Sequence, residues 1–150
     1  MRIQQNIIAE IRAFNRYYTG ILGLLDRHIL NSEFSLPEAR ILYELSQREG
    51  IQASGIIESL GIDKGYLSRI LEQFATKQLI VRKRSEADGR WMHIYLTEKG
   101  RAAFEKLNEA SDEQLKDLLS GLPAADSEEL SRHMTAITNI LIKAQATKEK

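Results

Sequence analysis

The sequence contains no cysteine among its 150 residues. Disulfide bonds, thiolate zinc sites and cysteine-based redox sensing are therefore excluded. A chain without cysteine suits a reducing compartment, and we expect a cytoplasmic protein. No apolar run approaches the roughly 18 residues that a membrane-spanning helix requires, and the first residues lack the unbroken apolar stretch of a secretory signal. We therefore expect no membrane partner.

Catalytic motifs are absent as well. The three histidines, His28, His93 and His133, lie far apart in the sequence, and there is no HExxH motif or glycine-rich phosphate loop. No serine stands in the pattern of a hydrolase nucleophile. We therefore expect that the protein is not an enzyme and that it has no cofactor and no metal site.

Net charge is also lacking, because 21 Lys and Arg balance 21 Asp and Glu. The charges are nevertheless unevenly distributed. Residues 61–101 hold nine basic and five acidic residues, a net charge of +4, which leaves −4 for the remainder of the chain. A local basic region is typical of proteins that bind phosphate backbones. Any nucleic-acid surface is therefore expected in this region.

The composition is that of a soluble folded protein, with 43% hydrophobic and 28% charged residues. Apolar residues recur every three or four positions over residues 3–30, from Leu36 to about Glu49, and in two long segments after Thr97. This spacing predicts a long helix at the start, a shorter helix in the middle and two long helices at the end.

The centre of the chain has the pattern of a helix-turn-helix. A short helix is predicted over residues 54–60, and Gly61-Ile62-Asp63 is typical of a tight turn in which Asp63 caps the next helix. That helix is predicted to span about residues 64–77, with one apolar and one polar face. A short helix, a glycine turn and a second amphipathic helix together indicate a helix-turn-helix.

A basic hairpin is predicted directly after this motif. Residues 79–84 are β-rich and then basic, and residues 91–96 alternate between two faces, as a half-buried strand does. Asp88-Gly89 between them is a preferred turn pair. The predicted fold class is mainly α with a small antiparallel β wing, a winged helix-turn-helix with N- and C-terminal dimerisation helices.

Eleven residues of this region are candidates for contact with double-stranded DNA. Tyr66 and Ser68 offer hydrogen bonds and apolar contacts in a major groove, and Arg69 can reach a phosphate or a guanine edge. Arg90 at the wing tip is placed for a minor groove, and Asp88 can aim it through a bidentate pair. The candidates are Lys64, Gly65, Tyr66, Ser68, Arg69, Gln73, Arg82, Lys83, Arg84, Asp88 and Arg90.

These candidates also have ordinary structural interpretations. Arg69 is also compatible with a solvated surface residue, and Tyr66 with a packing residue. The basic run at residues 82–84 is compatible with a solvated strand end. The Asp88–Arg90 pair is compatible with a purely structural contact that only shapes the wing.

The hairpin carries a specific motif. Asp88-Gly89-Arg90, five residues, and then Leu96-Thr97-Glu98-Lys99-Gly100 resemble the D-x-R and L-T-x-x-G wing signature of the MarR family. The helix-turn-helix is similar to that of the family at residues 60–64 and 67–69. The resemblance implies a homodimeric winged-helix transcription regulator, usually a repressor, that binds a palindromic operator. It also implies that the terminal helices form the dimer.

Two positions depart from the family pattern. Ile57 stands where alanine is usual in the packed helix pair, so we expect looser packing there. Gln78 stands where glycine usually ends the recognition helix. That helix end must therefore use another cap or hold a glutamine under strain.

The expected organisation is a single MarR-type domain over residues 1–150. Residues 35–100 are expected to form the DNA-binding lobe, and residues 1–31 and 101–147 the helical dimerisation region.

Many family members release DNA when a small ligand, often phenolic, binds between these two regions, so a small-molecule effector is an additional expected partner. Aromatic residues at helical spacing belong to a core more often than to such a cleft. The candidate lining residues are Tyr17, Tyr18, Phe34 and Tyr43.

Two other interpretations stay open. A winged helix can serve as a protein-interaction module without DNA contacts, because fold does not fix function. The segments at residues 12–19, 36–40 and 65–69 also look like the MarR-type half of proteins fused to a GNAT acetyltransferase. The chain would then be a stand-alone relative of these proteins or the regulatory half of an acetyltransferase system.

Overall fold

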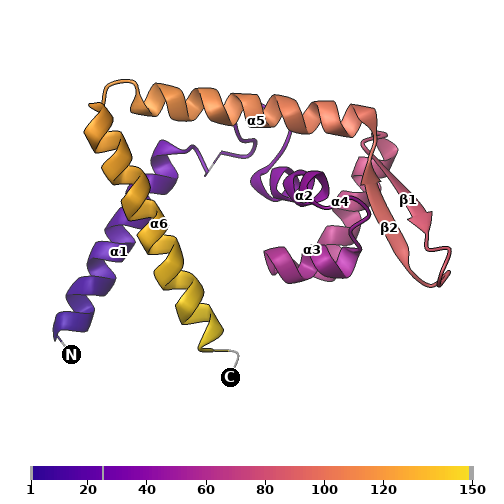
Figure 1. Cartoon of the computed structure of the whole chain (residues 1–150), viewed down its shortest axis with the longest axis horizontal. Helices are drawn as coiled ribbons and strands as arrows, with labels where there is room; N and C mark the ends of the chain where they lie inside the picture. Colours follow the sequence, from indigo (N-terminus) through magenta and orange to yellow (C-terminus); the bar gives the residue numbers. More distant parts are fainter. Residues whose placement is uncertain (1, 25, 149–150) are drawn as a thin grey trace. The chain divides into compact units, whose positions relative to one another are not determined.

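The computed structural model describes residues 2–24 and 26–148, and this part of the chain forms six helices and one two-stranded sheet (Figure 1). The helices are α1 (Arg2–Ile21), α2 (Leu36–Gln47), α3 (Ala53–Leu60), α4 (Lys64–Thr76), α5 (Glu98–Leu119) and α6 (Ala124–Ala146). The strands are β1 (Ile80–Arg84) and β2 (Met92–Leu96). The predicted fold class, mainly α with a small antiparallel β wing, is confirmed. None of the helices described is long and apolar enough to cross a membrane.

The chain divides into two compact units, residues 1–111 and residues 112–150, with the boundary inside α5. The first unit contains the winged lobe and the hydrophobic core. Leu107 of α5 is buried in that core, and Phe104 packs partly buried against it. The first part of α5 therefore belongs structurally with the winged lobe.

α1 ends at Ile21, well before the predicted end near residue 30. Gly23 adopts a left-handed conformation (φ +63°), and the N–H of Leu24 donates to the carbonyl of Thr19 at 3.1 Å. Such a glycine is a common helix C-terminal signal. The prediction of a longer helix was wrong because the apolar spacing continues past this glycine into a segment of turns.

The starts of α2 and α4 are both capped by side chains, and the cap at Asp63 is the one predicted. The carboxylate of Glu38 accepts from the backbone N–H of Ser35 at 2.7 Å, and the Ser35 hydroxyl accepts from the N–H of Glu38 at 3.4 Å. This capping box satisfies two N–H groups that lack helical partners. Asp63 caps α4 by accepting from the N–H of Tyr66 at 2.9 Å. Left-handed Gly61 (φ +60°) ends α3 between them.

One hydrophobic core supports the winged lobe. Its largest fully buried side chains come from α2, α3 and α4, and they are Phe74, Ile41, Leu42, Leu45, Ile56 and Leu67. The ring of Phe34 packs edge-on against Phe74, with 6.2 Å between centroids. This core fixes α4 against α2 and α3 and so determines which face of α4 is exposed.

The wing is an antiparallel hairpin whose base is fastened to the loop between α2 and α3. Ile80 lies opposite Leu96, and Ile94 is buried as the alternating pattern predicts. The N–H of Ile94 donates to the carbonyl of Ile51 at 3.0 Å, forming an isolated bridge. On the other face of the hairpin, Nδ1 of His93 lies 2.7 Å from the Gly50 carbonyl oxygen.

Candidate nucleic-acid interface

α4 presents a polar face to solvent because its apolar residues occupy the opposite side. Leu67, Ile70, Leu71 and Phe74 are all buried. All the candidates on α4 are exposed, and they are Lys64, Gly65, Tyr66, Ser68, Arg69 and Gln73. The structure therefore brings these six residues onto one accessible helix surface.

Tyr66 and Arg69 lie one turn apart on this surface and contact each other. The guanidinium carbon of Arg69 is 5.8 Å from the centre of the Tyr66 ring. A cation–π contact of this kind restricts the arginine without neutralising its charge. Arg69 is therefore a partly oriented cation, and Tyr66 is not a core residue.

The basic run of β1 is divided between two faces of the hairpin, because successive strand residues point in opposite directions. Arg82 lies opposite Ile94 and Arg84 opposite Met92, on one face. Lys83 lies on the other face, with its ammonium nitrogen 5.1 Å from the centre of the Tyr95 ring. Lys83 therefore does not share a surface with its two basic neighbours.

Arg82 has an acidic partner on α4. Its Nη1 lies 2.6 Å from Oε1 of Glu72, and the two side chains are 31% and 66% exposed respectively. Glu72 was not among the predicted site residues. The sequence separation between Glu72 and Arg82 does not predict this ion pair, because the pair depends on how the hairpin folds back along α4.

The wing tip is organised around Asp88. One carboxylate oxygen accepts from the backbone N–H of Arg90 at 3.0 Å, and the other accepts from Nη2 at 2.9 Å. Nε also donates to this carboxylate, at 3.1 Å. The geometry of the predicted pair is present, and the Arg90 side chain remains 88% exposed. Asp88 therefore aims a guanidinium group that stays accessible.

The same contacts shift both ionisation equilibria. Hydrogen bonds from the side chain and then the backbone of Arg90 hold the pKa of Asp88 below its ordinary value. The Asp88 carboxylate in turn raises the pKa of Arg90. Both groups are therefore charged at neutral pH, as an aimed phosphate or minor-groove contact requires.

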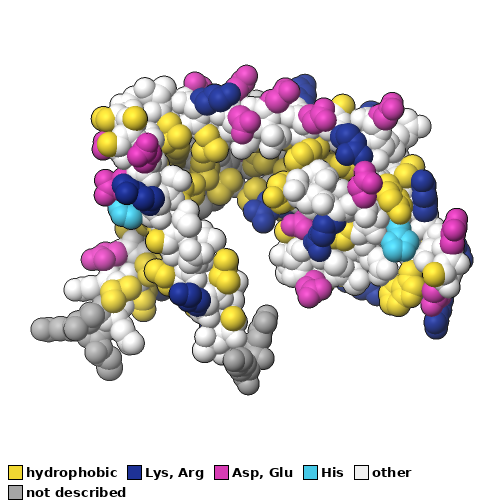
Figure 2. Space-filling model, viewed as in Figure 1, with side chains coloured by type: hydrophobic (Ala, Val, Ile, Leu, Met, Phe, Trp, Pro, Cys, Tyr) yellow, Lys and Arg dark blue, Asp and Glu magenta, His cyan; other side chains and the backbone are white. Residues whose placement is uncertain are grey.

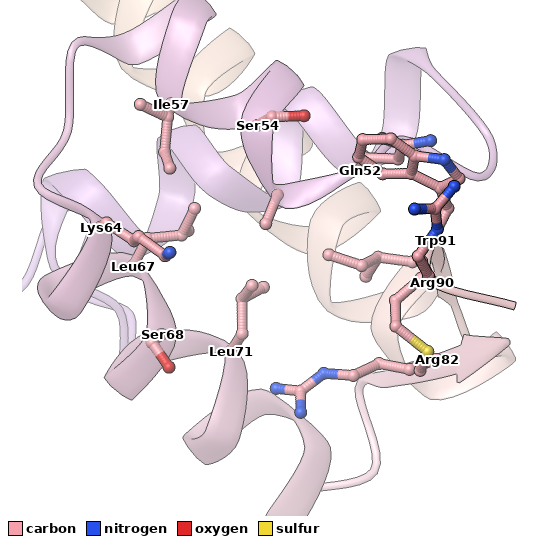
Figure 3. A pocket seen from close by; sticks show the side chains of 13 residues that line it. Gln52, Ser54, Ile57, Lys64, Leu67, Ser68, Leu71, Arg82, Arg90 and Trp91 are labelled. Carbon is pink, nitrogen blue, oxygen red and sulfur yellow. The ribbon is translucent and has the colours of Figure 1, made fainter. Parts of the chain in front are cut away.

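A groove of about 590 Å³ lies between α3, α4 and the wing (Figure 3). Its walls include the apolar side chains of Leu67, Leu71 and Ile57. Ile57 is only partly buried beside this space, which agrees with the looser packing expected there. Figure 3 shows Arg82 reaching across one end of the groove. Four candidates border it, and they are Lys64, Ser68, Arg82 and Arg90.

α4 ends at a left-handed glutamine. Gln78 has φ +61°, and the N–H of Leu79 donates to the carbonyl of Phe74 at 2.8 Å. The Gln78 carbonyl accepts from the hydroxyl of Thr97 at 2.6 Å. Of the two expected ways to end this helix, the chain therefore uses the strained glutamine.

The L-T-x-x-G segment holds the end of α4 against the start of α5. The Thr97 hydroxyl accepts from the N–H of Gly100 at 3.0 Å and so caps α5. A Cβ atom at Gly100 would lie only 2.0 Å from the carbonyl oxygen of Leu79. Only glycine permits this approach. The D-x-R half of the motif therefore orients Arg90, and the L-T-x-x-G half holds α5 against Leu79.

The four aromatic residues expected to line a ligand cleft are not gathered around one cavity. Phe34 is a core residue that borders a hollow of about 140 Å³, and Tyr17, Tyr18 and Tyr43 lie outside this hollow. Tyr18 stacks on Phe14 within α1, with 5.5 Å between centroids. Tyr43 is exposed, and its ring packs at a tilt near Phe104. The ligand site stays a prediction.

A family model described as MarR family matches residues 34–91. The HTH-type transcriptional regulator MgrA of Staphylococcus aureus is 27% identical over 139 residues, which is 93% of this chain and 87% of MgrA. A solved MarR family transcription regulator matches with a TM-score of 0.77 at 21% identity, over 99% of this chain and 97% of that chain.

FabT of Streptococcus pneumoniae, solved in complex with DNA, has a TM-score of 0.74 at 19% identity. The match covers 93% of this chain and 98% of FabT. The residues that the family model matches include Asp88 and Arg90 of the wing motif. The part of the chain that carries the helix-turn-helix and the wing tip therefore matches the MarR family.

Proposed function

We propose that the chain is a sequence-specific DNA-binding transcriptional regulator. The observation that carries this proposal is the pair of exposed, oriented guanidinium groups on one lobe, Arg69 on α4 and Arg90 at the wing tip. A helix fits the major groove, which is about 12 Å wide, and an arginine suits an adjacent narrow minor groove. The DNA complex of the related FabT and the function of the relative MgrA support the same proposal.

The candidates take different roles in this proposal. Tyr66, Ser68 and Arg69 read base edges, while Gly65 lets the backbone approach and Gln73 offers a further polar contact. The remaining cations contribute sequence-independent phosphate contacts. These are Lys64, Arg84 and, from the opposite face of the hairpin, Lys83. Figure 2 shows that Lys and Arg side chains are exposed on the wing.

We propose further that the regulator is a homodimer and that its terminal helices form the interface. On α1, Ile11 is 55% and Phe14 46% exposed. On α6, Ile140 is 65% exposed, and the helix has no buried residue in the part of the chain that the structure describes. Exposed apolar surface of this extent indicates an interaction site. Residues 1–31 and 101–147 are the proposed dimerisation region, and residues 35–100 the DNA-binding lobe, into whose core the first part of α5 also packs.

A symmetric dimer implies a symmetric DNA site. Two recognition helices about one helical turn apart, roughly 34 Å, read the two halves of a palindromic operator. Repression of transcription in the cytoplasm and release by a small ligand complete the proposal. The resemblance to the MarR family supports both.

Selection of bound duplexes from a random DNA pool tests this function directly. We expect enrichment of a palindromic sequence, and a gel shift of that duplex whose affinity falls with increasing salt. Arg69→Ala is expected to relax the preference at one base pair in each half-site, whereas Arg84→Ala lowers affinity uniformly. Failure to enrich any sequence, together with no shift at low salt, would show that the chain is not a DNA-binding regulator.

A further inference from the structure

The wing and α4 face each other across an open groove. The groove of about 590 Å³ separates the outer part of the wing, including Arg90 and Trp91, from Leu71 and Ser68 of α4 (Figure 3). A space of this size leaves the side chains that line it without packing partners on one side. Apolar packing alone therefore does not fix the outer wing against α4.

Polar contacts hold the wing in place. Near its base, the N–H of Ile94 donates to Ile51, and the Thr97 hydroxyl donates to Gln78 at the end of α4. At the level of Ile94, on the neighbouring strand, the Arg82 guanidinium meets Glu72. Among the ion pairs of the described residues, Arg82–Glu72 is the one that joins the wing to α4.

We propose that Glu72 is a positioning residue for DNA binding. Through Arg82 it holds β1 across the groove, and it thereby fixes where Arg90 lies relative to Arg69. The inference rests on the proposed function, since the two arginines are the groups that would contact adjacent grooves of one duplex. Glu72 itself need not touch the DNA.

The direction in which a charge-removing substitution at Glu72 changes DNA affinity distinguishes a positioning role from simple electrostatic repulsion. Glu72 is an exposed carboxylate on the DNA-facing side of α4, so it repels phosphates, and its removal by charge alone would strengthen binding. Loss of a positioning contact has the opposite effect. Exposed ion pairs contribute little to global stability, so Glu72→Gln is expected to remain folded.

The decisive experiment measures the contribution of Arg90 in two backgrounds. Dissociation constants are determined for wild type, Glu72→Gln, Arg90→Ala and the double variant, with the duplex selected from the random pool. In the wild-type background, Arg90→Ala is expected to weaken binding about 10-fold. In the Glu72→Gln background the same change is expected to cost less than about 2-fold, because the guanidinium no longer sits in register.

Two further variants serve as controls. Glu86 is an exposed acidic residue of the wing loop, and it takes part in none of the ion pairs of the described residues. Glu86→Gln removes its charge. It is expected to strengthen binding slightly and to leave the Arg90 contribution unchanged. The charge-swapped pair, Glu72→Arg with Arg82→Glu, rebuilds the contact with reversed polarity. It is expected to restore the Arg90 contribution, which a direct DNA contact by Glu72 would not explain.

A measurement without DNA tests the mechanical step. Trp91 is the single tryptophan of the sequence and borders the groove. The fast component of its fluorescence anisotropy decay is expected to grow in Glu72→Gln and to return to the wild-type amplitude in the charge-swapped pair. An unchanged amplitude would show that the ion pair does not restrain the wing.

The outcomes separate this inference from the proposed function. If wild type binds no duplex, the proposed function fails and the inference falls with it. If wild type binds but Glu72→Gln strengthens binding, or Arg90→Ala costs the same factor in both backgrounds, the positioning role alone is overturned.

Discussion

The hydroxyl of Thr97 donates a hydrogen bond to the carbonyl oxygen of Gln78, with 2.6 Å between the two oxygens. Nineteen positions separate the two residues, and the whole wing lies between them. The bond joins the C-terminal end of the recognition helix to the residue that caps α5. It also holds a glutamine whose left-handed backbone costs a non-glycine residue about 1 kcal/mol.

Replacing Gln78 with glycine is therefore expected to stabilise the fold. Relief of the left-handed strain is partly offset by the greater freedom of glycine in the unfolded chain, which leaves a gain of about 0.5 kcal/mol. Urea denaturation monitored by circular dichroism measures the change. A lower midpoint for Gln78→Gly would show that the glutamine side chain makes a contribution larger than the strain.

Thr97→Val keeps the shape of the side chain and removes the hydroxyl. The Gln78 carbonyl then loses a partner and α5 loses its cap, so we expect the free energy of unfolding to fall by about 1–2 kcal/mol. Thr97→Ser retains the hydroxyl and is expected to preserve most of that stability. Equal losses in the two variants would point to the methyl group instead of the hydrogen bonds.

Gly100→Ala tests the close approach between α5 and Leu79, the residue that precedes β1. The added Cβ would overlap the Leu79 carbonyl oxygen, and a loss of about 3 kcal/mol or more is expected. Gly20→Ala is the matched control, because nothing lies within 4 Å of its Cβ position and alanine favours the helix by about 1 kcal/mol. Thermal unfolding of both proteins should therefore move in opposite directions.

The wing-tip pair has a predictable pH dependence. Because Arg90 lowers the pKa of Asp88, the pair is present at neutral pH and is lost as the pH falls through the depressed value, below 3.8. Arg90→Ala should move the Asp88 carboxyl titration, followed by NMR, upward toward its ordinary value. A titration that is the same in both proteins would mean that the pair does not persist in solution.

A charge placed among the exposed apolar residues of the terminal helices is expected to dissociate the proposed dimer. Ile11→Glu on α1 and Ile140→Glu on α6 each put a carboxylate at an exposed apolar position, where burial in an interface would cost several kcal/mol. Analytical ultracentrifugation should show a dimer for wild type and a monomer for the variants. A wild-type monomer at micromolar concentration would exclude the proposed interface.

Local signals in the sequence are sufficient for most of the fold. The caps at Ser35 and Asp63 and the alternation around Ile94 predict the elements because each depends on neighbours a few residues away. The end of α1 is the exception, since apolar spacing continues past Gly23 and competes with the glycine signal. The Asp88–Arg90 pair is predictable for the same local reason, as its partners are two residues apart.

Contacts that depend on tertiary placement were not predictable. The division of the basic run in β1 follows from strand register, and the Arg82–Glu72 pair follows from how the hairpin lies along α4. Aromatic residues mark apolar environments without saying which one, and Phe34 belongs to the core. Sequence spacing therefore predicts which residues form the interface better than it predicts the contacts that orient their side chains.

The wing tip closes on itself within a few residues. The N–H of Ser85 donates to the carbonyl of Trp91, the N–H of Trp91 donates to that of Asp88, and Asp88 holds Arg90. All of these contacts lie inside residues 85–91, so the tip needs nothing from the helices to keep its shape. This segment is a transplantable unit: grafted onto another two-stranded hairpin of matching register, it should carry its oriented arginine with it.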